Sequence, residues 1–363
     1  IALGFEVKNG TNPDALLVKT NANGDTIFTK TFGSQNYNEF GMTVRQTTDD
    51  GYIVAIQNDK NQINNQQSIP RINIIKTNQL GDVQWSNTVV TDTISICTDI
   101  KQTLDGGYII TGTTLSNTLL PAVLLIKTDS QGNQIWNYNY LSQVNSYAVT
   151  GHNVQQTFDD GYIITGYKVF ANGVNGAMDN TFLIKTDALG GVVWTKIYSN
   201  TSERGGREVQ QTSDSSFVIV GNKDFGGFLL IKTNLSGDSL WSKEYSNSFN
   251  GSSIKQTIDG GYIMCGSSLG DSVILIKTDG IGTLQWLKSY DGGSGKDVQR
   301  TTDGGYIIAS ENYYDAYLIK TDGNGNITST FNIPIPNPNR KLQKIVDILG
   351  RDINPEKNKP FIE

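Results

Sequence analysis

The sequence predicts an all-β protein: a β-propeller, with seven four-stranded antiparallel blades as the best count, followed by a short C-terminal tail. A Lys-Thr pair preceded by Val or Ile recurs seven times in residues 1–330, at intervals of 43 to 58 residues. Each full repeat holds four short segments rich in β-branched and aromatic residues and bounded by Gly, Asp and Asn, a composition typical of strands. Four-stranded repeats of about 40 to 50 residues are the unit of propellers, whose ring leaves no long exposed sheet edge.

The four segments are typified by VQQT, GYIITG, LLIKT and NQIWNYNY. A DGG-type turn joins the first two, and a TDxxGN-type turn joins the last two. Glycine supplies the positive φ of tight hairpins, and Asp and Asn bond their own backbone, so both turns are predicted hairpins. The lysines that mark the repeats are Lys19, Lys76, Lys127, Lys185, Lys232, Lys277 and Lys320.

A large aromatic residue occupies a fixed place on the fourth segment of six repeats, and Ser329 replaces it in the last. Such rings bury about 150 to 250 Å² each, enough to fill the wedge between neighbouring blades. We therefore predict a blade-packing role for Phe28, Trp85, Trp136, Trp194, Trp241 and Trp286.

The first repeat lacks its first segment, so its blade is expected to lack the inner strand. The chain starts with Ile1, which matches the middle of a repeat, so we expect upstream residues to precede it and close the ring. Six or eight blades remain alternatives to seven.

The phrase LLIKTDSQGNQIW resembles the tryptophan-docking motif of quinoprotein-like propellers, which implies a fold and a Trp role; no adjacent cysteine pair accompanies it. The combination of TxDGGYIIxG with LIKTDxxGNxxW is similar to the repeat of secreted propeller-like proteins of the Bacteroidetes. That resemblance covers residues 1–330 and implies a secreted or outer cell-surface location more than an activity.

The tail differs from the repeats. Residues 331–339 are rich in proline and read as a stiff linker. At the start of the tail segment 340–363, NRKL (residues 339–342) and KIVDILGR (residues 344–351) resemble the opening of the C-terminal sorting domain of the type IX secretion system. This implies export across the outer membrane, with the type IX machinery as a partner; a linker with a small docking element is the alternative.

Composition restricts the partners. The net charge is −6 with scattered charges, which offers no basic stripe for nucleic acid. The longest apolar runs, such as PAVLLIK, are shorter than the roughly 20 residues of a transmembrane segment. Cys97 and Cys265 lie in different repeats, and neither a disulfide framework nor a zinc site is predicted.

The sequence favours a protein without catalytic activity or cofactor. His152 is the single histidine and has no nucleophile motif nearby. Most Asp residues recur as turn residues in every blade, whereas catalytic residues would stand out in one or two. Calcium is an alternative at TNANGD (residues 20–25) and TDGNGN (residues 321–326), but hairpin chemistry explains all copies of this turn.

Function is expected where the repeats differ. The hairpin turns are uniform and share one face of the ring, whereas the other connections vary in length, and variable loops on a rigid scaffold usually carry binding. We predict a binding or adhesion protein that recognises protein or glycan; a carbohydrate-active enzyme and a structural subunit are the alternatives. The candidate binding residues of this variable face are Tyr37, Phe40, Tyr140, Tyr147, His152, Phe170, Arg204, Tyr313 and Tyr314.

A polar residue also recurs on each inner strand, as in Arg45, Gln155 and Gln210. Either these residues line a polar channel or they form hydrogen bonds between adjacent blades, and the second reading is preferred because the residue recurs in every copy.

Overall fold

The computed structural model describes most of the chain up to Ile333. Its described ranges are 1–7, 12–22, 24–34, 37–60, 71–89, 94–115, 121–141, 146–172, 176–198, 203–223, 227–245, 249–268, 270–291, 293–312 and 315–333. The predicted linker, residues 331–339, overlaps the last strand at residues 331–333. Residues 334–339 and the segment 340–363 lie outside the described ranges.

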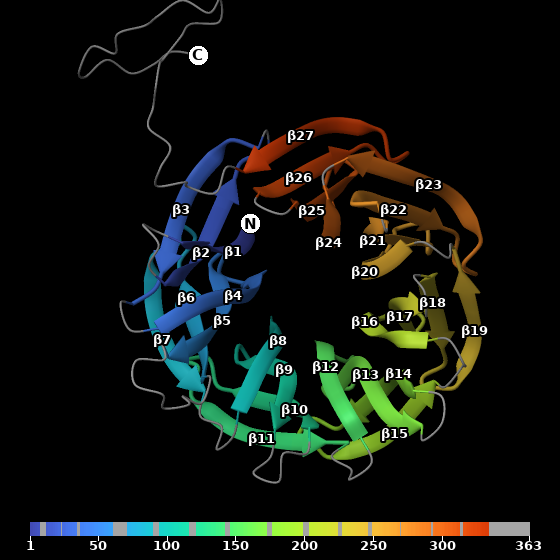
Figure 1. Cartoon of the computed structure of the whole chain (residues 1–363), viewed down its shortest axis with the longest axis horizontal. Helices are drawn as coiled ribbons and strands as arrows, with labels where there is room; N and C mark the ends of the chain where they lie inside the picture. Colours follow the sequence, from blue (N-terminus) through green and yellow to red (C-terminus); the bar gives the residue numbers. More distant parts are fainter. Residues whose placement is uncertain are drawn as a thin grey trace, which may run out of the picture.

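The described residues form seven antiparallel sheets arranged around a central axis, a seven-bladed propeller (Figure 1). Blades 1 to 4 comprise β1 (Ala2–Val7), β2 (Pro13–Thr20) and β3 (Thr26–Phe32); β4 (Tyr37–Gln46), β5 (Tyr52–Lys60), β6 (Arg71–Thr77) and β7 (Val83–Val89); β8 (Ile94–Gln102), β9 (Tyr108–Leu115), β10 (Pro121–Thr128) and β11 (Gln134–Tyr140); and β12 (Ser146–Gln156), β13 (Tyr162–Asn172), β14 (Gly176–Thr186) and β15 (Val192–Tyr198).

Blades 5 to 7 continue the same order. They comprise β16 (Glu203–Gln211), β17 (Phe217–Lys223), β18 (Gly227–Thr233) and β19 (Ser239–Glu244); β20 (Phe249–Gln256), β21 (Tyr262–Ser268), β22 (Ser272–Thr278) and β23 (Leu284–Asp291); and β24 (Ser294–Arg300), β25 (Tyr306–Asn312), β26 (Asp315–Thr321) and β27 (Ile327–Ile333). Each blade starts at the axis and ends at the rim, as the sequence predicts.

Blade 1 has three strands in the described structure, and β1 is its innermost strand (Figure 1). The described residues of this blade hold three of the four strands that the other blades have. Blade 1 joins blade 7 through an apolar cluster in which Leu16 and Val18 are packed with Leu318, so the ring is closed by side-chain packing at this junction.

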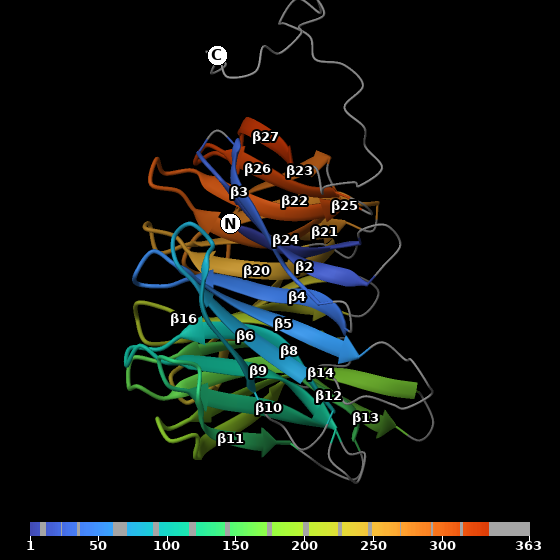
Figure 2. The same cartoon turned by 90° about the vertical axis from the view of Figure 1, so that its left-hand side faces the viewer.

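The two kinds of hairpin turn lie at one face of the disc, to the left in Figure 2. In the turn after β4, Asp50 has φ 61°, and Gly106 takes the equivalent place in blade 3 with φ 80°. The turn Asp is tied to the third strand: Lys76 Nζ lies 2.8 Å from Asp49 Oδ2 and donates to the Thr77 carbonyl at 2.8 Å. The repeated Asp and Lys therefore form an ion-pair lock, with a buried lysine and a half-exposed aspartate, between the first hairpin and the third strand.

This lock recurs in six blades. Its other pairs are Lys127 with Asp105, Lys185 with Asp159, Lys232 with Asp214, Lys277 with Asp259 and Lys320 with Asp303. In blade 1, which has no first hairpin in the described structure, Lys19 instead lies over the Tyr52 ring at 5.4 Å.

The aromatic residues of the outer strands contact an aromatic residue of the next blade. Trp136 meets Tyr162 of blade 4 at a ring distance of 6.0 Å, and Phe28 meets Tyr52 of blade 2 at 6.3 Å. The same contact joins Trp85 with Tyr108, Trp194 with Phe217, Trp241 with Tyr262 and Trp286 with Tyr306.

The core is distributed as apolar clusters between successive blades, for example Ile109, Val123 and Phe182 between blades 3 and 4. Cys97 and Cys265 are buried and free. Among the residues that the structure describes, no helix is long and apolar enough to span a membrane.

Candidate functional site

The sequence-predicted binding residues separate into three groups. Tyr37 and Phe40 lie on β4 at the variable face; Tyr140 and His152 take part in contacts between blades. The backbones of Tyr147, Phe170 and Arg204 lie in β12, β13 and β16, but their side chains, and Tyr313 and Tyr314 entirely, lie outside the described residues.

Tyr140 connects blades 3 and 4. Its side chain is 8% exposed, and its hydroxyl donates a hydrogen bond of 2.7 Å to the Gly190 carbonyl in a turn of blade 4. The same bond joins Tyr198, Tyr245 and Tyr290 to Gly237, Gly282 and Gly325. The structure thus gives Tyr140 a blade-joining contact shared by four blades.

His152 connects blades 4 and 5. Its Nδ1 lies 2.8 Å from the Gly206 carbonyl, which can only accept, so Nδ1 carries the proton and Nε2 is free to accept from Arg207 Nη1 at 3.4 Å. Burial and the Arg207 charge lower the His152 pKa to about 4. The ring is therefore neutral at pH 7.

Charged residues of the inner strands pair with one another at the centre of the ring. Arg45 Nη2 lies 2.8 Å from Asp99 Oδ1, and Arg45 Nη1 lies 3.8 Å from Asp297 Oδ2, which belongs to blade 7. Lys255 Nζ lies 2.7 Å from Glu208 Oε1. Lys101 lies 3.7 Å from Asp99, so this network balances three basic groups against three acidic ones.

Two uncharged members of the inner-strand set, Gln155 and Gln210, join adjacent blades. Gln155 Oε1 accepts a hydrogen bond of 2.7 Å from the backbone N–H of Gln211, and Gln210 Oε1 accepts one of 2.7 Å from the backbone N–H of Gln256. The preferred reading, hydrogen bonding between blades, is confirmed at these two residues. These central polar groups are largely satisfied by protein partners, which makes the centre a weak candidate site.

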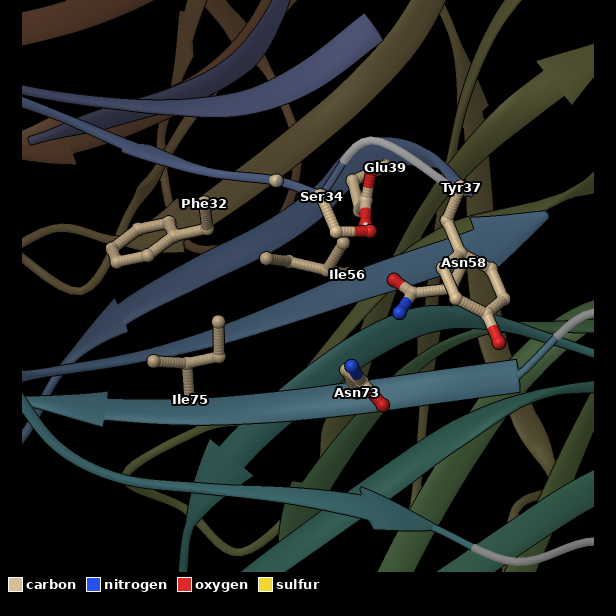
Figure 3. A pocket seen from close by; sticks show the side chains of 9 residues that line it. Phe32, Ser34, Tyr37, Glu39, Ile56, Asn58, Asn73 and Ile75 are labelled. Atoms are coloured by element: carbon tan, nitrogen blue, oxygen red, sulfur yellow. The ribbon is translucent and has the colours of Figure 1, made fainter. Parts of the chain in front are cut away.

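A cavity of about 300 Å³ opens between blades 1 and 2. Figure 3 shows its polar wall on one face of blade 2, where Glu39, Asn58 and Asn73 come from three neighbouring strands. Glu39 and Asn58 are direct cross-strand neighbours. The remaining lining residues are Phe32, Gly33, Ser34, Tyr37, Ile56 and Ile75. The cavity therefore lies at the variable face and includes the predicted residue Tyr37.

The polar wall of this cavity has unsatisfied acceptors. Glu39 is 5% exposed; its Oε1 accepts from Ser34 Oγ at 2.9 Å, while Oε2 is buried without a hydrogen-bond partner in the described part of the chain. The buried Asn58 Oδ1 also has no such partner. Burial raises the pKa of Glu39, with a further contribution from the Asp14 charge against the lowering effect of Ser34. Unsatisfied buried acceptors are costly, and a ligand with N–H or O–H groups would relieve that cost.

The Asn73 part of this polar wall is particular to blade 2. Asn73 stands three residues before the repeated lysine, and the same place holds Leu124, Phe182, Leu229 and Ile274 in blades 3 to 6, all buried. The counterpart of the Glu39 and Asn58 pair in blade 3 is Ser95 opposite Thr114, which bond each other at 3.0 Å. A polar exception to a repeated apolar position is the signal that distinguishes a site from scaffold.

Sequence reasoning identified Tyr37 but missed Glu39, Asn58 and Asn73. Asn73 could have been found from the sequence. When the repeats are aligned on their lysines, Asn73 is a polar residue at a position that is apolar in blades 3 to 6. Glu39 and Asn58 needed the register of β4 and β5, which places them opposite each other.

The acidic turns considered for calcium are closed by their own hydrogen bonds. Asp322 Oδ1 accepts from the Asn324 and Asn326 amides at 2.9 and 2.8 Å, and Asp25 Oδ2 accepts from Asn21 Nδ2 at 2.8 Å. No group of three metal-ligating side chains occurs within the described ranges. The absence of a cofactor stays a prediction.

No family model and no curated protein matches the chain. Solved structures do match. The BP39L lectin from Burkholderia pseudomallei is similar with a TM-score of 0.62 at 9% identity, covering 91% of this chain and 94% of the lectin. The WD40 β-propeller domain of Doa1 is similar with a TM-score of 0.51 at 13% identity, covering 87% of each chain. At these identities the similarity shows a shared propeller fold.

Proposed function

We propose that this chain is a binding propeller without catalytic activity, which recognises a protein or glycan ligand through its variable face. The observation that carries the proposal is the cavity between blades 1 and 2, where Glu39 Oε2 and Asn58 Oδ1 are buried without a hydrogen-bond partner in the described residues. In the same cavity Asn73 stands at a position that is apolar in blades 3 to 6. Blade 2 is held by the Lys76–Asp49 ion pair, and the Phe28–Tyr52 contact joins it to blade 1, which suits a preformed site.

The fold is compatible with either class of ligand. A protein named as a lectin and a WD40 domain both have the same architecture. Fold similarity alone does not select between glycan and protein, so the choice rests on the chemistry of the site.

The proposed location is the outer cell surface or the extracellular medium, in a protein of Bacteroidetes type. This is supported by the resemblance of the repeats and of residues 340–363, which we propose as the start of a type IX sorting segment. Fusing residues 331–363 to a reporter exported to the periplasm of a type IX-competent cell tests this: the reporter should reach the surface, and retention in the periplasm would count against it.

The binding role is tested with the full chain on a panel of immobilised glycans and extracellular proteins. Tyr37→Ala and Asn58→Ala should weaken binding, because both residues line the cavity. Gln79→Ala, in a turn on the opposite face of the same blade, is the matched control. Equal binding by all three variants would contradict the proposal.

The same panel tests the enzymatic alternative. Products are measured by mass spectrometry after prolonged incubation with each glycan. Turnover of any glycan would replace the proposed function with that of a carbohydrate-active enzyme, whereas stable, stoichiometric complexes support a binding protein.

A further inference from the structure

The cavity between blades 1 and 2 has a chemical preference that follows from its walls; this step rests on the proposed binding role. Its most buried acidic group is Glu39, whose Oε2 has no hydrogen-bond partner in the described structure. Asn58 can turn its amide to present either oxygen or N–H, so it adapts to an occupant. Glu39 cannot, because a carboxylate only accepts. The occupant must therefore donate to Glu39.

The charges around the cavity favour a cation. Asp14 of β2 adds negative charge near Glu39. A Cβ at Gly33 would overlap the Asp14 carboxylate, so the acid lies directly behind this part of the cavity wall. Arg71 is in register with Asn58 but is exposed, and no ion pair between it and Glu39 is found in the described structure. Phosphate, sulfate and carboxylate ligands are thus disfavoured at Glu39.

Another part of the lining is apolar. Phe32, Ile56 and Ile75 face the cavity together with the Tyr37 ring (Figure 3). An occupant that fits both parts carries a methylene chain against these side chains and a compact charged donor against Glu39. Lysine combines these properties, since its flexible stem packs on apolar surface and its ammonium offers three donors.

We propose that this cavity binds a primary ammonium group on an aliphatic stem, the chemistry of a lysine side chain presented by a protein partner. Glu39 Oε2 accepts from the ammonium, and Asn58 Oδ1 accepts a second of its three N–H donors. The partner surface around that lysine contacts the variable face near Tyr37.

The test uses the full chain and Nα-acetyl-lysine methylamide as a probe, with binding followed by chemical-shift changes. The Nε-acetylated form of the same probe has a similar stem without the charge, and methyl glucoside represents a neutral sugar. The charged probe should bind and the other two should not. Glu39→Gln keeps the acceptor for Ser34 but removes the charge, and it should weaken binding at least about tenfold, as expected for loss of a charge-assisted hydrogen bond.

Two further variants keep the test conclusive. Glu311→Gln removes an exposed carboxylate from blade 7 and should leave probe binding unchanged. Asn73→Leu introduces the residue that blades 3 and 5 carry at this place, so it should fold normally, fill the cavity and abolish binding. Equal binding of the charged and acetylated probes, unchanged binding by Glu39→Gln, or binding of methyl glucoside alone would overturn the proposal.

The panel ligands separate this inference from the binding role. A ligand that Asn73→Leu excludes but Glu39→Gln still binds would overturn the ammonium preference and leave the binding role intact. A ligand whose binding neither variant changes would show recognition elsewhere and overturn the assignment of the cavity.

Discussion

His152 is the single histidine of the chain and reports on one contact between blades. Its folded pKa of about 4 lies below the value of about 6.5 in an unfolded chain. As the pH falls below about 6.5, His152 therefore binds a proton in the unfolded state but stays neutral in the folded state. The stability of the propeller should decline between about pH 6.5 and 4 through this residue.

Nuclear magnetic resonance can follow the His152 ring without assignment, because there is no second histidine. We expect a midpoint near pH 4, and His152→Gln should remove the decline in stability over this range. A midpoint near 6.5 would mean that the ring is solvated and available for ligand contact, as its position in the sequence first indicated.

Tyr140 allows a similar separation of structural and binding roles. Tyr140→Phe deletes the hydroxyl that donates to Gly190 and leaves the ring. The free energy of unfolding should fall by about 1 kcal/mol, the usual net value of such a bond, in chemical denaturation with unchanged slope. Ligand binding at the variable face should be unaffected; weaker binding with unchanged stability would restore Tyr140 as a recognition residue.

At the scale of the hairpin, Asp49 and Asp50 are adjacent residues with different roles. Hydrogen bonds from Lys76 and then Thr47 lower the Asp49 pKa to about 2. Asp50 supplies the positive φ of the turn, a conformation that Asn also tolerates. Asp49→Asn should cost about 1 kcal/mol, a modest value because Asp49 is half exposed and its ion pair is partly screened.

The stability lost in Asp49→Asn should depend on pH, because the pKa of Asp49 is lower in the folded state than in the unfolded state. Above about pH 4 the Asp49 carboxyl is ionised in both states and its stabilisation is complete. As the pH falls toward 2, the unfolded state binds the proton first and the stabilisation is lost. The difference between wild type and Asp49→Asn should therefore vanish near pH 2. Asp50→Asn is the control, and a loss equal to that of Asp49→Asn would show that the turn, not the ion pair, carries the effect.

The strands, turns and aromatic wedges could be predicted because each repeats, and repetition averages out local ambiguity. Trp136 and its counterparts can be recognised in the sequence because each stands at a fixed distance from a turn glycine. The site could not be predicted in the same way, since it depends on which strands face each other. Glu39 and Asn58 are 19 positions apart in sequence and become neighbours only through the register of β4 and β5. The sequence alone places Tyr140 on the variable face. Its structural contact could not be predicted, because the hydroxyl partner, Gly190, lies in the following repeat.

At the scale of the whole ring, the blades are unequal. In blades 3 to 6 an inner-strand side chain reaches the next inner strand, as where Glu208 accepts from the Ile254 amide at 2.8 Å and Ser253 accepts from the Val298 amide at 3.3 Å. Blade 1 has three strands in the described structure. Its neighbours on either side meet at the centre of the ring, where Arg45 Nη1 of blade 2 lies 3.8 Å from Asp297 Oδ2 of blade 7. Fewer hydrogen bonds and neighbours should make β1 and β2 the first part of the ring to open.

Native-state hydrogen exchange measures this directly. Amides of β1 and β2 should exchange at least about tenfold faster than those of β13 and β14, which are central strands of a complete blade, because local opening requires less free energy where fewer buried contacts are lost. Since the cavity wall of Glu39 and Asn58 faces blade 1, a ligand bound there should slow exchange in both blades 1 and 2 and leave blade 5 unchanged. Uniform protection around the ring would show that the junction between blades 7 and 1, packed through Leu16 and Leu318, stabilises blade 1 as strongly as an inner strand stabilises the others.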